Sequence, residues 1–253
     1  METRVDEIAE KIYRLSTFVP GTAGPGGLTF NQFLIDADEP LLFHCGQRFL
    51  FPSVADAVGK IIAVDRLRWI TFSHVESDEC GSMNDWLAAA PNATAAHGNI
   101  GCNIWLKDTA VRPPRALADG EVLDLGGKKV RRIDTPHLPH CWDAGLLYEE
   151  NTGTLFCSDL FTQMGDGPAM TDDDIVGPAI AVERRLGFTA VSPKTAPMVR
   201  KLAALSPRKL AVMHGSSFSG NVSAVLEGLS SFYDEQLRKG VPEGLCNEAR
   251  RVL

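Results

Sequence analysis

The sequence of 253 residues lacks several features that would assign it to common classes of protein. No apolar run approaches the roughly 20 residues that a membrane-spanning helix needs, so we expect no membrane span. The charged N-terminus, Met1 to Glu7, has no apolar stretch of the kind found in signal peptides, which predicts a cytoplasmic protein. There is no basic block and the net charge is −7, which argues against a nucleic-acid-binding surface.

The cysteines show no pattern typical of a metal-binding or disulfide framework, because all six are isolated in the sequence and no C-x-x-C pair occurs. This spacing argues against a zinc ribbon and against an iron–sulfur cluster. In a reducing compartment we expect free thiols rather than disulfides. The residues concerned are Cys45, Cys80, Cys102, Cys141, Cys157 and Cys246.

Nothing in the sequence divides the chain into parts, since we find no linker, low-complexity tract or internal repeat. With 44% apolar residues the chain can build a sizeable core, and we expect a single domain over residues 1–253. Strands are expected at 8–18, 30–36, 40–44, 67–72, 93–97, 120–125, 128–133, 145–150, 154–158 and 210–213, and helices at 52–62, 83–90, 195–205 and 222–239. This mixture predicts an α/β (α+β) fold in which helices cover the outer faces of two packed sheets.

Potential metal ligands gather where the predicted strand 67–72 ends. His74, Glu76 and Asp78 alternate, so in extended backbone they would all point to one side. Imidazole and carboxylate are the usual side-chain ligands of first-row metals. The simpler alternative is a polar turn with one hydrogen-bonded histidine, because short motifs often match by chance.

Three later strands deliver residues of the same kind at their ends. His137 and His140 follow the strand 128–133, Asp159 follows 154–158, and His214 follows 210–213. Ligands at the C-terminal ends of four strands are what a metal site at one rim of a sheet would require. The segment 163–187, rich in Gly, Pro and Asp, is expected to form a mobile lid that covers this rim and admits only small molecules.

The order of these motifs resembles the metallo-β-lactamase superfamily, whose fold is a four-layer αβ/βα sandwich with a metal site at one edge. Most members have a second histidine where this chain has Glu76. Glutamate there is similar to the di-iron branch, which comprises flavodiiron proteins and stand-alone oxygen-binding di-iron proteins. The runs 140–143, His-Cys-Trp-Asp, and 159–163, Asp-Leu-Phe-Thr-Gln, resemble the same branch.

The resemblance implies a complete ligand set. One iron would be held by His74, Glu76, His140 and Asp159, and the other by Asp78, Asp159 and His214, with Asp159 bridging. Flavodiiron proteins continue into a flavodoxin-like flavin-binding domain, and this sequence ends at Leu253 without one. A reductase would therefore need an external electron donor. Related proteins commonly form dimers, so a homodimer is a further expectation.

Three other histidines near these motifs also need assignment. In the superfamily the ligand histidine lies eight residues before an aromatic or apolar position on the next strand, and Tyr148 places it at His140 rather than His137. We expect His137 to be a loop residue or to contact a ligand. His44 is expected to make hydrogen bonds near the rim, and His97 to be structural or exposed.

Glu79 departs from the family pattern, which has histidine at this position. Ligation of the second metal by Glu79 would raise the ligand charge from −3 to −4 and balance two divalent ions. Alternatively, the side chain turns away and is held by a hydrogen bond near a helix N-terminus, where negative charge is favoured. The charge argument favours ligation.

The ligand set and the resemblance lead to three functional hypotheses. A carboxylate-rich set without thiolate suits iron or manganese better than zinc, although zinc and manganese stay open as alternatives. We expect two iron ions and a protein that binds or reduces O2, or a related small oxidant such as NO or peroxide. The alternatives are a metal-dependent hydrolase of an ester, lactone or thioester, and a non-catalytic oxygen sensor.

Overall fold

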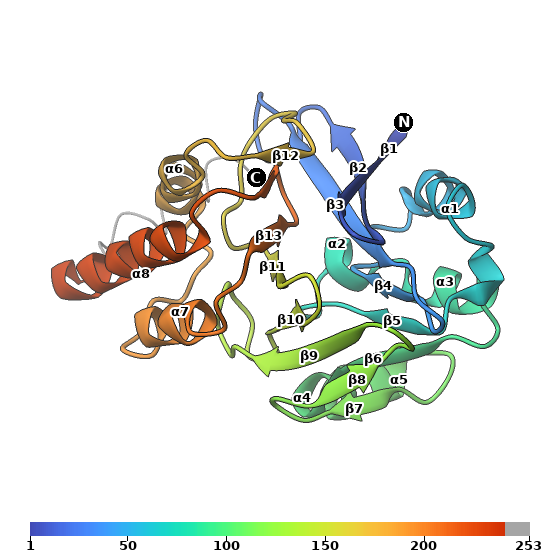
Figure 1. The fold of residues 1–253 in the computed structure, drawn as a ribbon. Coiled ribbons are helices and arrows are strands. Elements are labelled where there is room, and N and C mark those ends of the chain that lie inside the picture. Colours follow the sequence, from blue (N-terminus) through green and yellow to red (C-terminus); the bar gives the residue numbers. More distant parts are fainter. Residues whose placement is uncertain (241–253) are drawn as a thin grey trace.

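The computed structural model of the protein describes residues 1–240 and contains two seven-stranded sheets (Figure 1). The first sheet has the order β1-β2-β3-β4-β5-β6-β7. Its strands are β1 (Thr3–Ala9), β2 (Ile12–Val19), β3 (Leu28–Ile35), β4 (Leu41–Phe43), β5 (Trp69–Thr71), β6 (Thr94–Gly98) and β7 (Arg115–Leu117). The pairs from β1 to β4 are antiparallel, and those from β4 to β7 are parallel.

The second sheet has the order β12-β14-β13-β11-β10-β9-β8. Its strands are β8 (Val122–Asp124), β9 (Lys129–Asp134), β10 (Gly145–Glu149), β11 (Thr154–Ser158), β12 (Met170–Thr171), β13 (Lys209–Val212) and β14 (Ser217–Phe218). Strand β10 runs antiparallel to both β9 and β11, and β11 runs parallel to β13. Strands β9, β11 and β13 therefore point the same way, and their C-terminal ends lie at one edge.

Helices flank the sheets. They are α1 (Phe51–Gly59), α2 (Ser77–Cys80), α3 (Met83–Ala89), α4 (Asn99–Gly101), α5 (Lys107–Thr109), α6 (Val176–Leu186), α7 (Thr195–Ala203) and α8 (Val222–Lys239), with a 3-10 turn, η1 (Val64–Arg66), and a π-helical turn, η2 (Cys102–Leu106). Figure 1 shows α1 and α3 outside the first sheet, and α6, α7 and α8 outside the second. None of the helices within residues 1–240 is long and apolar enough to cross a membrane.

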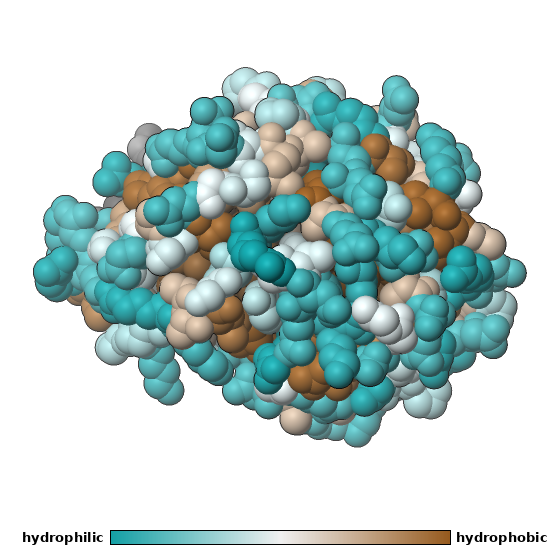
Figure 2. All heavy atoms as spheres, viewed as in Figure 1, coloured by the Kyte–Doolittle hydropathy of each residue, from teal (hydrophilic) through white to brown (hydrophobic). Residues whose placement is uncertain are grey.

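Three apolar cores hold these layers together. Between the sheets, Phe33 and Phe43 of the first sheet meet Phe156 of the second, with ring centroids 5.5 and 5.2 Å apart. Separate clusters of buried side chains join each sheet to its own helices. Because each sheet is apolar on both faces, it must be covered on both, which gives the layer order helix, sheet, sheet, helix. The molecular face in Figure 2 is mostly hydrophilic, with small apolar patches between polar side chains.

The expected elements are largely present, and the main differences are the following. The extended run predicted through Asp78 stops at Glu76, because helix α2 begins at Ser77 and Cys80 N–H donates to Glu76 O at 2.9 Å. The expected lid contains regular structure, namely β12 and helix α6. The segment 99–117, for which no element was expected, forms α4, η2, α5 and β7.

The cysteines agree with the expectation as far as they are described. Cys45, Cys80, Cys102, Cys141 and Cys157 are free. Cys246 lies outside the described residues.

Candidate metal centre

Four of the predicted ligands converge at the rim where β5, β9 and β11 end. His74 follows β5, His140 lies between β9 and β10, and Asp159 follows β11. Glu76 Oε2 lies 2.9 Å from His74 Nε2 and 3.2 Å from His140 Nε2. Asp159 Oδ2 lies 3.0 Å from His140 Nε2 and 3.5 Å from His74 Nε2. These atoms are close enough together to serve one metal ion.

A second group lies on the other side of Asp159. His214, which follows β13, places Nε2 3.1 Å from Asp159 Oδ1 and 3.3 Å from Asp78 Oδ2. Asp78 is in α2, so the turn into that helix carries it away from Glu76 and toward His214. The structure therefore arranges the six predicted ligands in two groups that share only Asp159.

The two oxygens of Asp159 are in the arrangement that a bridging carboxylate needs. Oδ2 faces His140 and Oδ1 faces His214. Oδ1 is buried and accepts no well-directed hydrogen bond, although His214 is near. A buried carboxylate oxygen without a hydrogen bond is costly unless something else satisfies it, and a metal ion would do so. The donor set of three imidazoles and three carboxylates fits two borderline or hard divalent ions.

Burial and mutual contacts shift the pKa values of these groups strongly. Burial opposes ionisation of Asp159, but the His140 hydrogen bond and nearby His214 outweigh it and hold the Asp159 pKa well below its usual range. The hydrogen bonds of His140 and His74 lower the pKa of Glu76 to about 2. Burial disfavours the charged form of His140, yet Asp159 and its other partners raise its pKa to about 12. Without a metal, these contacts favour the protonated form of the histidines, so metal binding would have to displace protons.

Glu79 is not part of either group. Its carboxylate is fully buried, and its Oε2 accepts a hydrogen bond from Ser73 N–H at 2.8 Å. Oε1 accepts from Ser158 Oγ at 2.5 Å, and His44 Nε2 lies 3.2 Å from Oε2. Burial raises the Glu79 pKa to about 8. The structure has the alternative arrangement, in which the side chain turns away, although its partners are Ser73, Ser158 and His44 rather than the N-terminus of a helix. We leave Glu79 out of the proposed ligand set.

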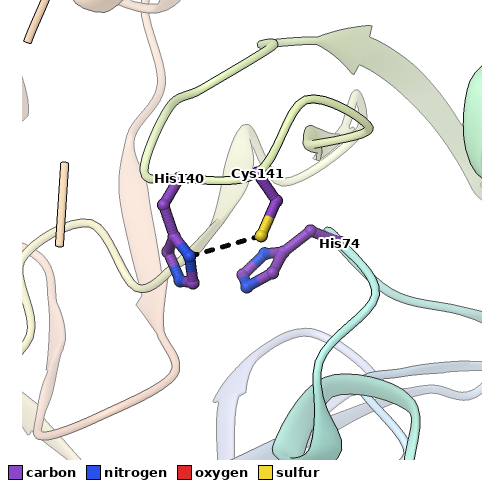
Figure 3. Close-up of side chains that lie close together, drawn as sticks. All are labelled: His74, His140 and Cys141. Carbon is purple, nitrogen blue, oxygen red and sulfur yellow. Dashed lines mark hydrogen bonds between the residues drawn. The ribbon is translucent and has the colours of Figure 1, made fainter. Parts of the chain in front are cut away.

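Cys141, which belongs to the run 140–143, lies beside this cluster, although it was not among the predicted ligands. Its Sγ is 3.4 Å from His140 Nδ1, and Figure 3 shows it next to both His140 and His74. The thiol thus contacts the ring nitrogen of His140 that faces away from Asp159. Its Sγ and ring nitrogens of His74 and His140 also lie close enough together to hold one metal ion.

The remaining histidines lie outside the cluster. The His137 side chain is exposed, and the backbone N–H of this residue donates to the backbone oxygen of Cys141 at 2.7 Å. His44 is fully buried, with Nδ1 3.2 Å from Asn31 O, in agreement with a hydrogen-bonding role. His97 is fully buried and stacks on Phe72, so it is structural rather than exposed.

A cavity of about 180 Å³ opens at the two groups. Apart from the ligands, its walls are mainly apolar: Ala23, Leu28, Thr162, Met164, Leu186 and Phe188. Met164 and Leu186 come from the segment 163–187 that was expected to cover the rim, so this segment forms part of the cavity wall. Phe188 also lies against His140, with ring centroids 5.7 Å apart. The space is small and its wall offers few groups that could bind a polar organic substrate.

Sequence comparison assigns the family. Residues 28–183 match the sequence profile described as ODP family beta lactamase. The chain belongs to this family. A putative diflavin flavoprotein A 1 of Thermosynechococcus vestitus is 26% identical over 220 residues, which are 84% of this chain and 38% of that protein. The protein of the same description from Nostoc sp. is 30% identical over 138 residues, which are 53% of this chain and 24% of that protein. The chain spans less than two fifths of the length of these relatives.

Solved structures confirm the fold. The metal-soaked Flv1 flavodiiron core of Synechocystis sp. PCC6803 superposes with a TM-score of 0.80 at 20% identity, covering 93% of this chain and 62% of that one. The rubredoxin oxygen:oxidoreductase of Desulfovibrio gigas gives 0.76 at 18% identity, covering 91% and 62%. The expected four-layer metallo-β-lactamase sandwich is thus confirmed.

Proposed function

We propose that this domain binds two iron ions and uses them to bind or reduce O2 or a related small oxidant such as NO or peroxide. Its ligands would be His74, Glu76 and His140 for one ion, Asp78 and His214 for the other, and Asp159 for both. The observation that carries the proposal is the placement of the two Asp159 oxygens against separate ligand groups. Iron bound by these residues would supply the redox chemistry for reducing such an oxidant.

The chain's own residues support this chemistry in two ways. The carboxylate-rich donor set favours iron or manganese over softer metals. The apolar wall, including Met164 and Phe188, would exclude bulk water and admit a small apolar molecule. A hydrolase of esters, lactones or thioesters would instead need polar groups to orient its substrate, and the wall provides few.

Electrons would come from a donor outside the domain. The name of one structural neighbour, rubredoxin oxygen:oxidoreductase, pairs an electron-carrying protein with oxygen. We propose a comparable protein or flavin donor for this domain, and a cytoplasmic location, which agrees with the five free cysteines among residues 1–240.

Oxygen uptake by iron-loaded protein tests the function. Protein reconstituted with iron under anaerobic conditions is mixed with O2 and excess chemical reductant. Continued O2 consumption by the wild type, abolished in Asp159→Ala, is the expected result. A stable oxygen adduct without turnover would indicate the sensor instead. Hydrolysis of a test ester or thioester by zinc-loaded protein, with no oxygen reaction of the iron form, would overturn the proposal.

A further inference from the structure

Two arginines are buried in this fold away from the surface. Arg14 on β2 is fully buried, and Arg132 on β9 is 1% exposed. Burying a guanidinium is costly unless its hydrogen bonds repay the lost solvation. Neither arginine belongs to the proposed ligand set, and both donate to backbone carbonyl groups. Arg132 also pairs with Asp134, whose Oδ1 lies 3.2 Å from its Nε.

Arg14 holds the turn that carries His214. Its Nη2 donates to Gly215 O at 3.0 Å, and Asn31 Nδ2 donates to the same carbonyl at 2.8 Å. On the other side of the turn, Gly215 N–H donates to Thr29 Oγ1 at 2.7 Å. His214 Nδ1 lies 2.8 Å from Thr29 O, which leaves Nε2 facing Asp78 and Asp159.

The hydrogen bond to Gly215 O is the main polar contact of the Arg14 side chain. Among residues 1–240, Gly215 O is the only hydrogen-bond acceptor of the guanidinium, whose Nε and Nη1 have no hydrogen-bond partner. Asp6, 3.6 Å from Nη1, partly balances the charge. Gly215 has φ +112°, a conformation that side chains rarely adopt, and an added Cβ would lie 2.6 Å from Gln163 Cβ. The turn is thus unusual, and fixed donors keep it in place.

Arg132 holds the other ligand loop in a similar way. Its Nη2 donates to Asp143 O at 3.1 Å and its Nη1 to Phe72 O at 3.3 Å. Asp143 Oδ2 in turn accepts a hydrogen bond from the backbone N–H of Val75 at 3.0 Å, and Val75 is the residue between His74 and Glu76. His97 Nε2 lies 3.2 Å from the same oxygen. Arg132 therefore fixes the segment that presents the first ligand group.

We propose that the two metal sites are positioned independently by two buried arginines, Arg14 for the His214 site and Arg132 for the His74–Glu76 site. The inference rests on the proposed metal centre, but not on its reaction with oxygen. Outer groups that orient metal ligands typically change affinity by roughly 10–100-fold when they are removed.

Cobalt(II) binding tests this division. His214→Ala leaves the first site as the binding site, and His140→Ala leaves the second, so each background reports one site. We expect Arg14→Met to weaken cobalt binding roughly 10–100-fold in the His140→Ala background and to leave it unchanged in the His214→Ala background. Arg132→Met should show the reverse pattern. Methionine keeps much of the apolar stem and removes the hydrogen-bonding fork.

Two controls separate positioning from general folding. Thermal unfolding of the metal-free variants shows whether the fold is intact. The Arg14→Lys variant keeps a charged N–H donor group, so its second-site cobalt affinity should be higher than that of Arg14→Met. Equal weakening of both sites by each arginine variant, or no weakening at all, would overturn the inference. If each arginine variant loses cobalt affinity at one site only, and the iron-loaded protein never reacts with oxygen, the inference is supported and the proposed function is refuted.

Discussion

Asp78 and Glu79 are neighbours in the chain, yet their carboxylates lie in different environments. Asp78 Oδ2 is 3.3 Å from His214 Nε2, beside the cavity. Glu79 is fully buried, accepting hydrogen bonds from Ser73 N–H and Ser158 Oγ. Both residues belong to helix α2, in which consecutive side chains point in directions about 100° apart, so the two carboxylates face different sides of the helix.

This difference predicts opposite outcomes for the same chemical change. Asp78→Asn should remove a ligand and lower the metal affinity of the second site by about 100-fold or more. This loss exceeds the effect of substituting a residue that only contacts a ligand. Glu79→Gln should keep both metals, because an amide can still accept from Ser73 N–H. Metal analysis after dialysis measures both variants. Loss of the second metal from Glu79→Gln with retention in Asp78→Asn would restore Glu79 as a ligand.

The two histidines of the β9–β10 loop provide a second matched pair. His140→Ala should weaken chiefly the metal held with His74 and Glu76, because its Nε2 faces both Glu76 and Asp159. His137→Ala should leave occupancy largely intact, since His137 is exposed. Cobalt titration of the two variants decides between them. An emptied site in His137→Ala alone would show that the wrong histidine was chosen.

Asp159→Ala should cost both metals, because both ligand groups depend on it. Asp166→Ala is a suitable control, since Asp166 lies nearby in the chain and pairs with Arg4 at the surface. Metal content of the two purified variants is the measurement. Retention of one full equivalent by Asp159→Ala would mean that one site does not use this carboxylate.

Metal binding should release protons near pH 7 and tighten as the pH rises. Burial disfavours charged histidine, but Glu79 and Glu76 raise the pKa of His74 to about 9, and Asp159 raises that of His140 to about 12. Both are therefore protonated in the metal-free protein at neutral pH and must lose a proton to bind metal. Calorimetry in buffers of different ionisation enthalpy counts the protons. Binding without proton release, and with no pH dependence, would contradict these pKa values.

The sequence predicted much of the fold because the core strands are apolar runs bounded by turn residues. The hairpin β10–β11 and helix α8 are examples, and each falls close to its predicted range. Helix α6 was not predicted because the segment around it is rich in glycine, proline and aspartate. Its buried face, which includes Ala179 and Val182, is also too short to give a clear helical pattern. Packing against α8 stabilises it, which no local pattern reveals.

The convergence of His74, Asp159 and His214 was predictable, because each of these candidate ligands directly follows a strand. Glu79 was placed with the ligands on charge alone, and the sequence could not show that Ser158, far along the chain, would reach its carboxylate. The supporting arginines were also missed. Arg14 reads as an ordinary polar strand residue, and only the crossing of β2 with the β13–β14 turn gives it a partner.

Mössbauer spectroscopy and iron analysis of the iron-loaded wild-type protein show directly whether Asp159 bridges two irons. We expect two irons per chain in one magnetically coupled centre, with the coupling and both irons lost in Asp159→Ala. A single iron per chain, or two irons that show no coupling in the wild type, would contradict a dinuclear centre bridged by Asp159.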